Sequence, residues 1–346
     1  MKAAFLTGPM RFQVREIPDP QVPDEGLVMN VKACGICGSD LRRWKEGPPA
    51  VSGSVIPGHE AAGIVESVGS ACSGFKPGDR IAVAPDIHCG TCWYCAREQF
   101  NLCDNLKLLG ITPGYPGAFA EKLVLTGEVL ANGIVHPIPQ GLSFEHAAVA
   151  EPCSSALACH AALGTCGEET VVIAGGGPMG CIHVALARAL GARTIVSEPN
   201  AARRDLVRRF GPEAVVDPLA EDLKEKVLGL TGGLGADAVV CANPAADTQR
   251  QAVEIVRKGG TVVLFGGLPK LHPMAVFDAN RIHYGEIRIV GSFSYHPRFH
   301  ASALEMIRSA GIHADLLVTH RFPLDRIGEA FAAAFGGDAL KVEVLF

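Results

Sequence analysis

The stretch Val171-Val-Ile-Ala-Gly175-Gly-Gly177-Pro-Met-Gly180 decides the fold of one half of this chain. It begins with a fully apolar run, which is typical of a strand buried on both faces of a parallel sheet. Its glycines fit the pattern Gly-x-Gly-x-x-Gly, and the alanine-rich segment 179–190 predicts a helix directly after the turn. Gly175 permits a tight turn, Gly177 lets the backbone approach a pyrophosphate, and Gly180 lets helix and strand pack closely. The stretch therefore predicts a dinucleotide site at a helix N-terminus.

The end of the next predicted strand, 194–198, indicates which dinucleotide binds. Glu198 lies eighteen residues after Gly180. A carboxylate there accepts hydrogen bonds from a ribose 2′-OH and repels a 2′-phosphate. Arg203 argues the other way, because its guanidinium can reach a 2′-phosphate. We therefore expect NAD, with NADP as the alternative and a glycine-rich turn without ligand as the remaining interpretation.

The rhythm of apolar runs divides the chain into two kinds of domain. From about residue 170, apolar strands alternate with helical segments, which predicts a doubly wound parallel sheet of the α/β class. Residues 1–150 contain short apolar runs separated by Gly and Pro, typical of a mostly-β domain. We expect domains at 1–150 and 151–295, with 296–346 returning to the first. A helix predicted over 144–163 contains Pro152, which should kink it or begin a new helix.

Bulk properties exclude several classes of partner. The chain has 346 residues and a formal net charge of −5, without a long basic run, so nucleic acid and membrane surfaces are not expected partners. The apolar start ends at Thr7-Gly8-Pro9, too early for a signal peptide, and no apolar stretch approaches the roughly 20 residues of a spanning helix. We expect a soluble cytoplasmic protein.

Four of the twelve cysteines fall within fifteen residues, namely Cys89, Cys92, Cys95 and Cys103. Thiolates this close in sequence bind a metal or form disulfides. Zn²⁺ takes four ligands in a tetrahedron, and an all-cysteine set leaves no open position. Because nothing else in the chain indicates secretion, a structural zinc site is favoured over two disulfides.

A second cluster lies upstream, where Gly35-Ile-Cys37-Gly-Ser39-Asp40 is followed by Gly58-His59-Glu60. A thiolate, an imidazole and a nearby carboxylate suit a zinc ion that keeps one coordination position open. Such an ion polarises an alcohol oxygen as a Lewis acid. A cysteine and a histidine about twenty residues apart do not by themselves establish the site.

In order and spacing these segments, together with Pro77-Gly-Asp-Arg80 and Glu151-Pro152, resemble those of zinc-dependent medium-chain alcohol dehydrogenases over essentially the whole chain. The resemblance is strongest to the sorbitol (iditol), threonine and polyol dehydrogenase branch, in which a glutamate followed by proline is the third ligand of the catalytic zinc. It implies a GroES-like catalytic domain carrying a structural-zinc lobe at about 86–106, and a Rossmann domain that binds NAD. It also implies a homotetramer or a dimer, the latter paired through edge strands near 287–293.

The resemblance implies roles for individual residues. Cys37 and His59 would bind the catalytic zinc, with Glu151 or Glu60 supplying a carboxylate, and Ser39 would relay the substrate proton. For Glu60 the alternative, slightly favoured, is that it supports the ligands without binding the metal. Asp40 would orient His59, and the four clustered cysteines would bind the structural zinc. Cofactor contacts are expected at Gly175, Gly177, Pro178, Met179, Gly180, Glu198, Arg203, Ser292 and Phe293. Substrate contacts are expected at Arg43, Tyr115, Phe119 and Tyr295, although core packing is an equal alternative for Phe119.

Two positions depart from the family pattern. Arg42 stands where many relatives carry a relay histidine, and arginine does not release a proton near neutral pH. Ser294 stands where sorbitol dehydrogenases carry arginine, which argues against sorbitol itself. Arg42 or Arg43 is predicted to bind an anion, either the cofactor pyrophosphate or an acidic or phosphorylated substrate. A solvated basic turn is the alternative.

The function expected from these features is zinc-dependent transfer of a hydride from a secondary alcohol, such as a polyol, cyclitol or sugar alcohol, to NAD. A threonine-type amino-alcohol dehydrogenase and a sugar-phosphate dehydrogenase are the alternatives within the enzyme class. From another class comes a non-catalytic nucleotide sensor or structural protein on the same scaffold. The intact Cys37, His59 and Glu151 argue against it, because a retired site would be free to lose its ligands.

Overall fold

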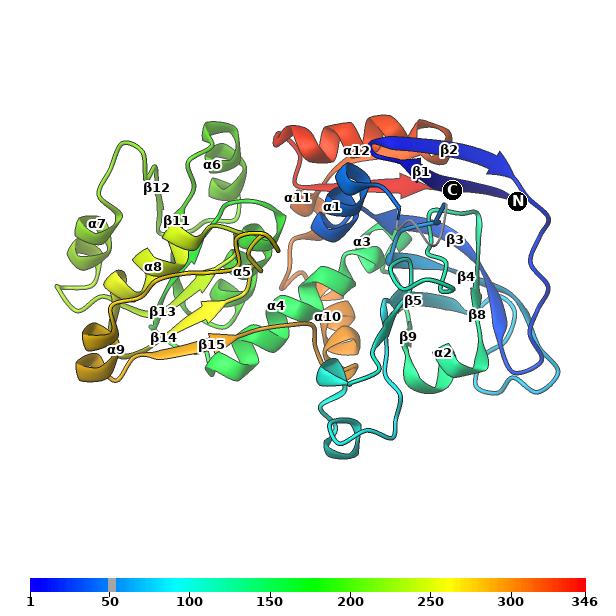
Figure 1. Cartoon of the computed structure of the whole chain (residues 1–346), viewed down its shortest axis with the longest axis horizontal. Coiled ribbons are helices and arrows are strands. Elements are labelled where there is room, and N and C mark those ends of the chain that lie inside the picture. Colours follow the sequence, from blue (N-terminus) through cyan, green and yellow to red (C-terminus); the bar gives the residue numbers. More distant parts are fainter. Residues whose placement is uncertain (49–53) are drawn as a thin grey trace. The chain divides into compact units, whose positions relative to one another are not determined.

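A computed structural model describes residues 1–48 and 54–346, which divide into two compact units (Figure 1). The first unit comprises Met1–Ser154, Tyr295–Ala310 and Leu317–Phe346. The second unit comprises Ser155–Ser294 and Gly311–Leu316. Every helix within these described residues is too short or too polar to cross a lipid bilayer.

The second unit is a six-stranded parallel sheet with the order β12-β11-β10-β13-β14-β15. The order reverses at β10, so right-handed crossovers place α5 and α6 on one face and α8 on the other. The predicted doubly wound fold is thereby confirmed. Its elements are β10 (Thr170–Ala174), α5 (Pro178–Ala189), β11 (Arg193–Ser197), α6 (Ala201–Arg208), β12 (Ala214–Val216), α7 (Leu223–Leu230), β13 (Ala236–Cys241), α8 (Ala246–Ile255), β14 (Val256–Leu264), α9 (Ala279–Gly285) and β15 (Arg288–Gly291).

The first unit is built on a largely antiparallel seven-stranded sheet with the order β16-β17-β3-β4-β5-β9, in which β8 also pairs with β3. The C-terminal strand β17 pairs with β3, which lies about 300 residues earlier (Figure 1). The strands of the first unit are β1 (Lys2–Gly8), β2 (Arg11–Glu16), β3 (Leu27–Gly35), β4 (Glu60–Val68), β5 (Arg80–Ala84), β6 (Asp86–Ile87), β7 (Lys107–Leu108), β8 (Lys122–Leu125), β9 (Ile134–Pro137), β16 (Val318–Pro323) and β17 (Lys341–Leu345). Its helices are α1 (Gly38–Glu46), α2 (Gly127–Asn132), α3 (Phe144–Ala148), α10 (Arg298–Arg308) and α12 (Ile327–Gly336).

The segment predicted as one helix over 144–163 forms two helices, α3 and α4 (Ala150–Leu163). Pro152 lies in the first turn of α4, where its missing N–H costs no helical hydrogen bond. The proline therefore begins a new helix, one of the two expected outcomes. This break places Glu151 at the start of α4.

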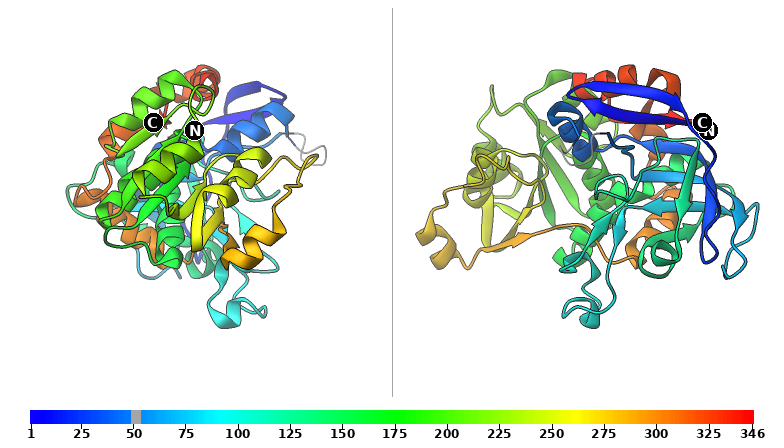
Figure 2. Two further views of the ribbon diagram at one scale, coloured as in Figure 1. Left: turned by 90° about the vertical axis from the view of Figure 1, so that its left-hand side faces the viewer. Right: turned by 45° about the vertical axis from the view of Figure 1, so that its right-hand side comes forward.

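The four clustered cysteines lie in a lobe of residues 86–108 that projects from the first unit (Figure 2). Two short strands close its base, where Asp86 pairs with Leu108 and Ile87 with Lys107. Between them the chain forms only two short 3₁₀ helices, η1 (Cys95–Arg97) and η2 (Phe100–Leu102). With so little regular structure, we expect the lobe to depend on its cysteines for order.

A buried histidine pair links α4 to α5 in the second unit. The Nδ1 of His183 lies 3.1 Å from the Nε2 of His160, whose own Nδ1 lies 3.0 Å from the Thr165 hydroxyl. Burial lowers the pKa of His160 to about 4 and that of His183 well below its usual value. Both imidazoles are therefore neutral in the folded protein at neutral pH.

This pair should make the protein less stable in mild acid. In the unfolded chain both imidazoles take up protons below about pH 6.5, whereas the folded protein holds them neutral. Their contribution is complete above that pH and is lost as the pH falls. Each histidine should cost about 1.4 kcal/mol of unfolding free energy between pH 7.5 and 5.5. Urea unfolding at the two pH values measures the loss.

The double variant His160→Leu with His183→Leu should take up about two fewer protons on unfolding in acid. Its free energy of unfolding should therefore depend less on pH. Replacing the exposed His272 with glutamine provides the matched control. An unchanged pH dependence in the double variant would contradict the assignment.

Candidate metal and dinucleotide sites

The register of β3 with β4 assembles a three-residue donor set in the first unit. Gly35 at the end of β3 pairs with Glu60 at the start of β4. The chain then supplies Cys37 as the N-cap of α1 and His59 immediately before β4. One ligand atom each from Cys37, His59 and Glu60 lies within 4.8 Å of the others.

Two side chains of α1 support this donor set. Asp40 is 2 % exposed, and one of its carboxylate oxygens accepts a hydrogen bond of 3.1 Å from the backbone N–H of Cys37. Its other oxygen lies 3.5 Å from the Nδ1 of His59. The Ser39 hydroxyl lies 3.5 Å from the opposite ring nitrogen, Nε2. Asp40 is thus placed to orient His59, and Ser39 to exchange a proton beside it.

Glu60 has a cationic partner that the sequence did not indicate. Lys341 of β17 is buried, forms an ion pair with the Glu60 carboxylate, and donates a 3.1 Å hydrogen bond to the carbonyl of Ile36. Burial alone lowers the pKa of Lys341, but the charges of Glu60 and Cys37 outweigh it and raise that pKa. No sequence pattern could have found this pair, because 281 residues separate its members.

Glu151 lies outside the group of three. Its Oε1 accepts a 3.2 Å hydrogen bond from the hydroxyl of Tyr295, which is 3 % exposed. Burial, followed by the charge of Glu60, raises the pKa of Glu151 to about 7. Tyr295, predicted as a substrate contact, is therefore placed to position Glu151.

The donor set fits a divalent zinc ion. A thiol, an imidazole and a carboxylate are the ligand types that zinc takes at sites with an open position. The carboxylates of the buried Asp40 and Glu60 and of the half-buried Glu151 lie here, and a bound cation would offset the negative charge that Lys341 leaves unneutralised.

The four lobe cysteines fit a second zinc ion. All four are free thiols, and their sulfur atoms lie within 4.8 Å of one another. The sulfurs of Cys89 and Cys95 are 4.0 Å apart, close to the edge of about 3.8 Å expected for a tetrahedron of Zn–S bonds near 2.3 Å. Backbone and side-chain hydrogen bonds from Thr91 lower the pKa of Cys89 to about 5. The lobe therefore presents a closed tetrahedral donor set in place of disulfides.

The glycine-rich turn of the second unit is shaped for close backbone approach. Gly175 has a φ of 116°, and a Cβ on Gly180 would lie 1.9 Å from the Gly175 carbonyl oxygen, so neither position accepts a side chain. Gly177 is the N-cap of α5 and Pro178 its first residue. The free N–H groups of this helix end can receive a pyrophosphate.

Glu198 closes the turn from the end of β11. It is 4 % exposed, and its two carboxylate oxygens accept hydrogen bonds from the backbone N–H groups of Gly176 at 2.7 Å and Asn200 at 2.8 Å. The guanidinium of Arg203 reaches to 4.0 Å from the Cβ position of Gly177. The turn thus has both a carboxylate, from Glu198, and a guanidinium, from Arg203, beside it. Of the other predicted cofactor contacts in this unit, Ser292 lies half-buried just beyond β15 and Phe293 is 61 % exposed.

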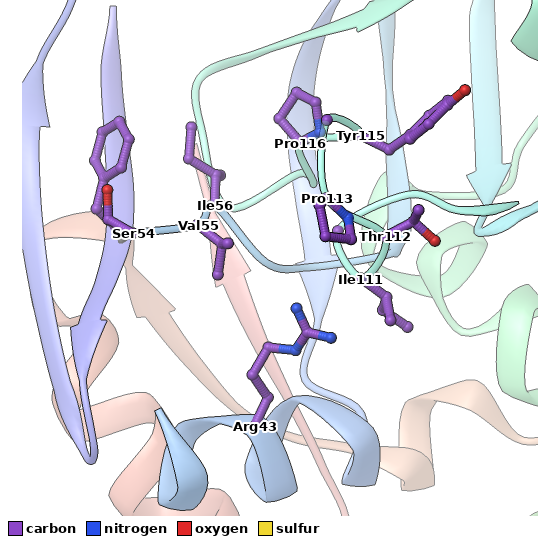
Figure 3. A pocket seen from close by; sticks show the side chains of 12 residues that line it. Arg43, Ser54, Val55, Ile56, Ile111, Thr112, Pro113, Tyr115 and Pro116 are labelled. Atoms are coloured by element: carbon purple, nitrogen blue, oxygen red, sulfur yellow. The ribbon is translucent and has the colours of Figure 1, made fainter. Parts of the chain in front are cut away.

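A cavity of about 410 Å³ opens in the first unit between α1 and two loops (Figure 3). Arg43 points into it from α1, and Tyr115 lies in the loop on the far side. Phe119 does not line this cavity. It is fully buried, with its ring 5.6 Å from that of Phe331, so it belongs to the hydrophobic core.

Comparison with known proteins identifies the class. A family model described as "Alcohol dehydrogenase GroES-like domain" matches residues 23–139, and one described as "Zinc-binding dehydrogenase" matches residues 178–309. Sorbitol dehydrogenase of Bacillus subtilis (strain 168) is 33 % identical over 354 residues, covering 99 % of this chain and 97 % of the relative. D-arabitol-phosphate dehydrogenase of Enterococcus avium is 30 % identical over 331 residues, covering 94 % and 91 %.

A zinc-binding dehydrogenase from Sinorhizobium meliloti 1021, solved with NADP bound, superposes with a TM-score of 0.90 at 33 % identity, covering 100 % of this chain and 99 % of that one. The chain therefore belongs to the zinc-dependent medium-chain alcohol dehydrogenases. Within that family it belongs to the sorbitol and polyol dehydrogenase-like branch, and it is an enzyme that uses zinc and NAD(P). The non-catalytic alternative is thereby set aside.

Proposed function

We propose that this enzyme oxidises a secondary alcohol of the polyol class to a ketone and reduces NAD to NADH, with release of one proton. The observation that carries the proposal is the grouping of Cys37, His59 and Glu60 within 4.8 Å, with the Ser39 hydroxyl 3.5 Å from His59. This places metal donors and a proton-accepting hydroxyl around one point. An amino-alcohol or a sugar phosphate remains an alternative substrate, because the donor set acts on any carbinol.

Each residue has a defined task in this reaction. A zinc ion held by Cys37, His59 and a carboxylate from Glu60 or Glu151 would lower the pKa of the substrate hydroxyl. Ser39 relays the hydroxyl proton, releasing its own hydroxyl proton as it takes up that of the substrate. Asp40 keeps His59 oriented by facing its Nδ1. A nicotinamide bound by the second unit would supply the hydride acceptor.

The proton leaves Ser39 by a route that does not include Arg42. Arg42 is exposed on α1, and a guanidinium keeps its proton near neutral pH. Proton release therefore differs from that of relatives with histidine at this position.

We propose NAD as the preferred coenzyme, and Glu198 supports this choice. Its carboxylate is fixed at the end of β11 by the N–H groups of Gly176 and Asn200, so a 2′-phosphate beside it would meet a localised negative charge. Arg203 near the glycine turn is the feature that favours NADP.

Replacing Glu198 with glutamine should shift coenzyme preference toward NADP. Glutamine keeps the side-chain length but removes the charge, so the ratio of kcat/KM for NADP to that for NAD should rise about tenfold. Glu213→Gln is a control, because this exposed glutamate pairs with Arg193 away from the turn. An unchanged ratio in the Glu198 variant would show that the charge of Glu198 does not determine the preference for NAD.

We further propose a homo-oligomer in which the edge strand β15 pairs with its copy. We also propose that the protein is located in the cytoplasm. The edge carries exposed apolar side chains, with Val290 40 % and Phe293 61 % exposed. Twelve free thiols support a reducing compartment. Sedimentation of wild type against Val290→Lys tests the oligomer, since a dimer or tetramer paired at this edge should dissociate.

The proposed function is tested by following NADH absorbance with a panel of polyols, amino-alcohols and sugar phosphates, together with metal analysis. We expect two zinc ions per chain and turnover of at least one polyol-class alcohol, with activity lost on chelation. One zinc ion and no turnover across the panel would refute the proposal.

A further inference from the structure

Arg43 is unusual among the half-buried arginines of this chain. Its guanidinium forms no hydrogen bond or ion pair with any residue that the structure describes. Other arginines that are shielded from solvent are paired. Arg281 donates to the carbonyls of Val253 and Glu254, and Arg80 donates to that of Leu142. A half-buried guanidinium with no protein partner is available to pair with a ligand.

The surroundings of Arg43 define the chemistry of that partner. The guanidinium points into the cavity of about 410 Å³ (Figure 3), a volume within the range of small-molecule sites. Arg43 is the one charged residue among the described residues that line it. The remaining walls are mainly apolar, including Val55, Ile56 and Ile111. Such walls strengthen the attraction between a cation and an anionic group.

The tyrosine on the far wall does not compete for this role. The Tyr115 hydroxyl donates a 2.8 Å hydrogen bond to Glu128, and Lys107 neutralises that carboxylate at 2.6 Å. The phenol and the nearby acid are therefore already paired with each other and with a lysine. Arg43 is therefore the residue of the cavity wall that is available to bind an anionic group.

Two residues that line the cavity, Arg43 and Ile56, lie within four residues of members of the catalytic site along the chain. Arg43 follows Ser39 by four residues on α1, so both side chains lie on one helix face with Cβ atoms about 6 Å apart. Ile56 precedes His59 by three residues. Hydrogen bonds from the N–H of Gly117 to the Ile56 carbonyl, 2.8 Å, and of Ala118 to the Gly58 carbonyl, 2.9 Å, fix the far loop to the same segment. A ligand at Arg43 is thus a short carbon chain away from a carbinol beside Ser39.

We propose that the substrate is an anionic polyol, carrying a carboxylate or a phosphate monoester at the end remote from the oxidised carbinol, and that Arg43 binds this anion. The inference rests on the proposed dehydrogenase function and names its substrate class. Arginine is suited to the task because its planar fork matches both anions bidentately. Arg43 is therefore a specificity residue of the enzyme.

The test compares a neutral polyol with its own phosphate ester and its own aldonate in the holoenzyme. Wild type should show a higher kcat/KM for at least one of the two anions than for the neutral parent, and the preferred anion distinguishes phosphate from carboxylate. Arg43→Gln should lower kcat/KM for that anion by about 10- to 100-fold, the usual loss for a charged hydrogen bond. The neutral polyol and the KM for NAD should change less than about twofold, and Arg43→Lys should retain part of the preference.

Arg42→Gln is the matched control, since it removes the same charge from an exposed neighbour and should leave the preference intact. The inference is overturned if wild type prefers the neutral polyol, or if Arg43→Gln lowers kcat/KM equally for neutral and anionic substrates. A rise confined to the KM for NAD would assign Arg43 to the cofactor pyrophosphate and also overturn it. Failure of wild type to oxidise any alcohol would instead refute the proposed function.

Discussion

Replacing Cys37 with alanine is expected to lower kcat/KM for the best alcohol by at least about a thousandfold, while the thermal midpoint of unfolding changes little. The thiolate is one of three donors grouped at the catalytic site, and a loss of this size corresponds to about 4 kcal/mol of transition-state stabilisation. Cys37 is only partly buried at the start of α1, so alanine leaves no large cavity. Initial rates, metal content and calorimetry measure the three quantities.

The matched variant is Cys95→Ala, for which we expect the opposite pattern. Cys95 is 5 % exposed within the lobe, where four thiols form a closed set with no position for substrate. Its loss should release one zinc ion and lower the thermal midpoint, and the molecules that remain folded should keep kcat. A Cys95→Ala protein that stays fully stable yet loses kcat alone would show that the two metal sites do not divide the work in this way.

Replacing Lys341 with methionine should lower the free energy of unfolding by about 3–5 kcal/mol, the usual cost of removing one partner of a buried ion pair. Lys341 holds the buried Glu60, and Glu343 on the same strand is also buried with neither carboxylate oxygen hydrogen-bonded. Burial raises the pKa of Glu343 well above its usual value, and the charge of Lys341 opposes that rise. Without the lysine, the buried Glu60 would lose its ion-pair partner, and the buried Glu343 would lose a cation that lowers its pKa.

Two controls separate charge from packing. Lys341→Arg keeps the cation and should recover part of the stability. Lys76→Met removes a lysine whose side chain is 80 % exposed in its pair with Asp79, and should cost less than about 1 kcal/mol. Chemical denaturation of all three variants measures the differences. A Lys341→Met protein as stable as wild type would show that the Glu60 ion pair contributes no net stability.

Local patterns predicted much of this enzyme correctly. The glycine-rich turn with its flanking strand and helix occurs where predicted, and Pro152 begins a new helix. The four lobe cysteines come together as their spacing implied. These features can be predicted from sequence because their interacting groups lie within about twenty residues of one another. Over that distance the chain allows few conformations that bring the groups together.

Long-range pairings lay beyond sequence patterns. The partner of Glu60 is Lys341, 281 residues away, and the partner of Glu151 is Tyr295, 144 residues away. Phe119, for which substrate contact and core packing were equal alternatives, is fully buried in the core. Strand register and side-chain direction decide such outcomes, and both depend on the packed sheet.

The sequence by itself determined the class of this protein: a dinucleotide turn, a closed cysteine set and an open Cys–His–Glu set are each encoded in short segments of chain. The tertiary structure alone decided which charged and polar groups meet. It paired Glu60 with Lys341, Glu151 with Tyr295, and left Arg43 unpaired among its described neighbours at an apolar cavity. The physical reason is that electrostatic partners are selected by distance in space and by exclusion of water, and only the packed fold sets either quantity.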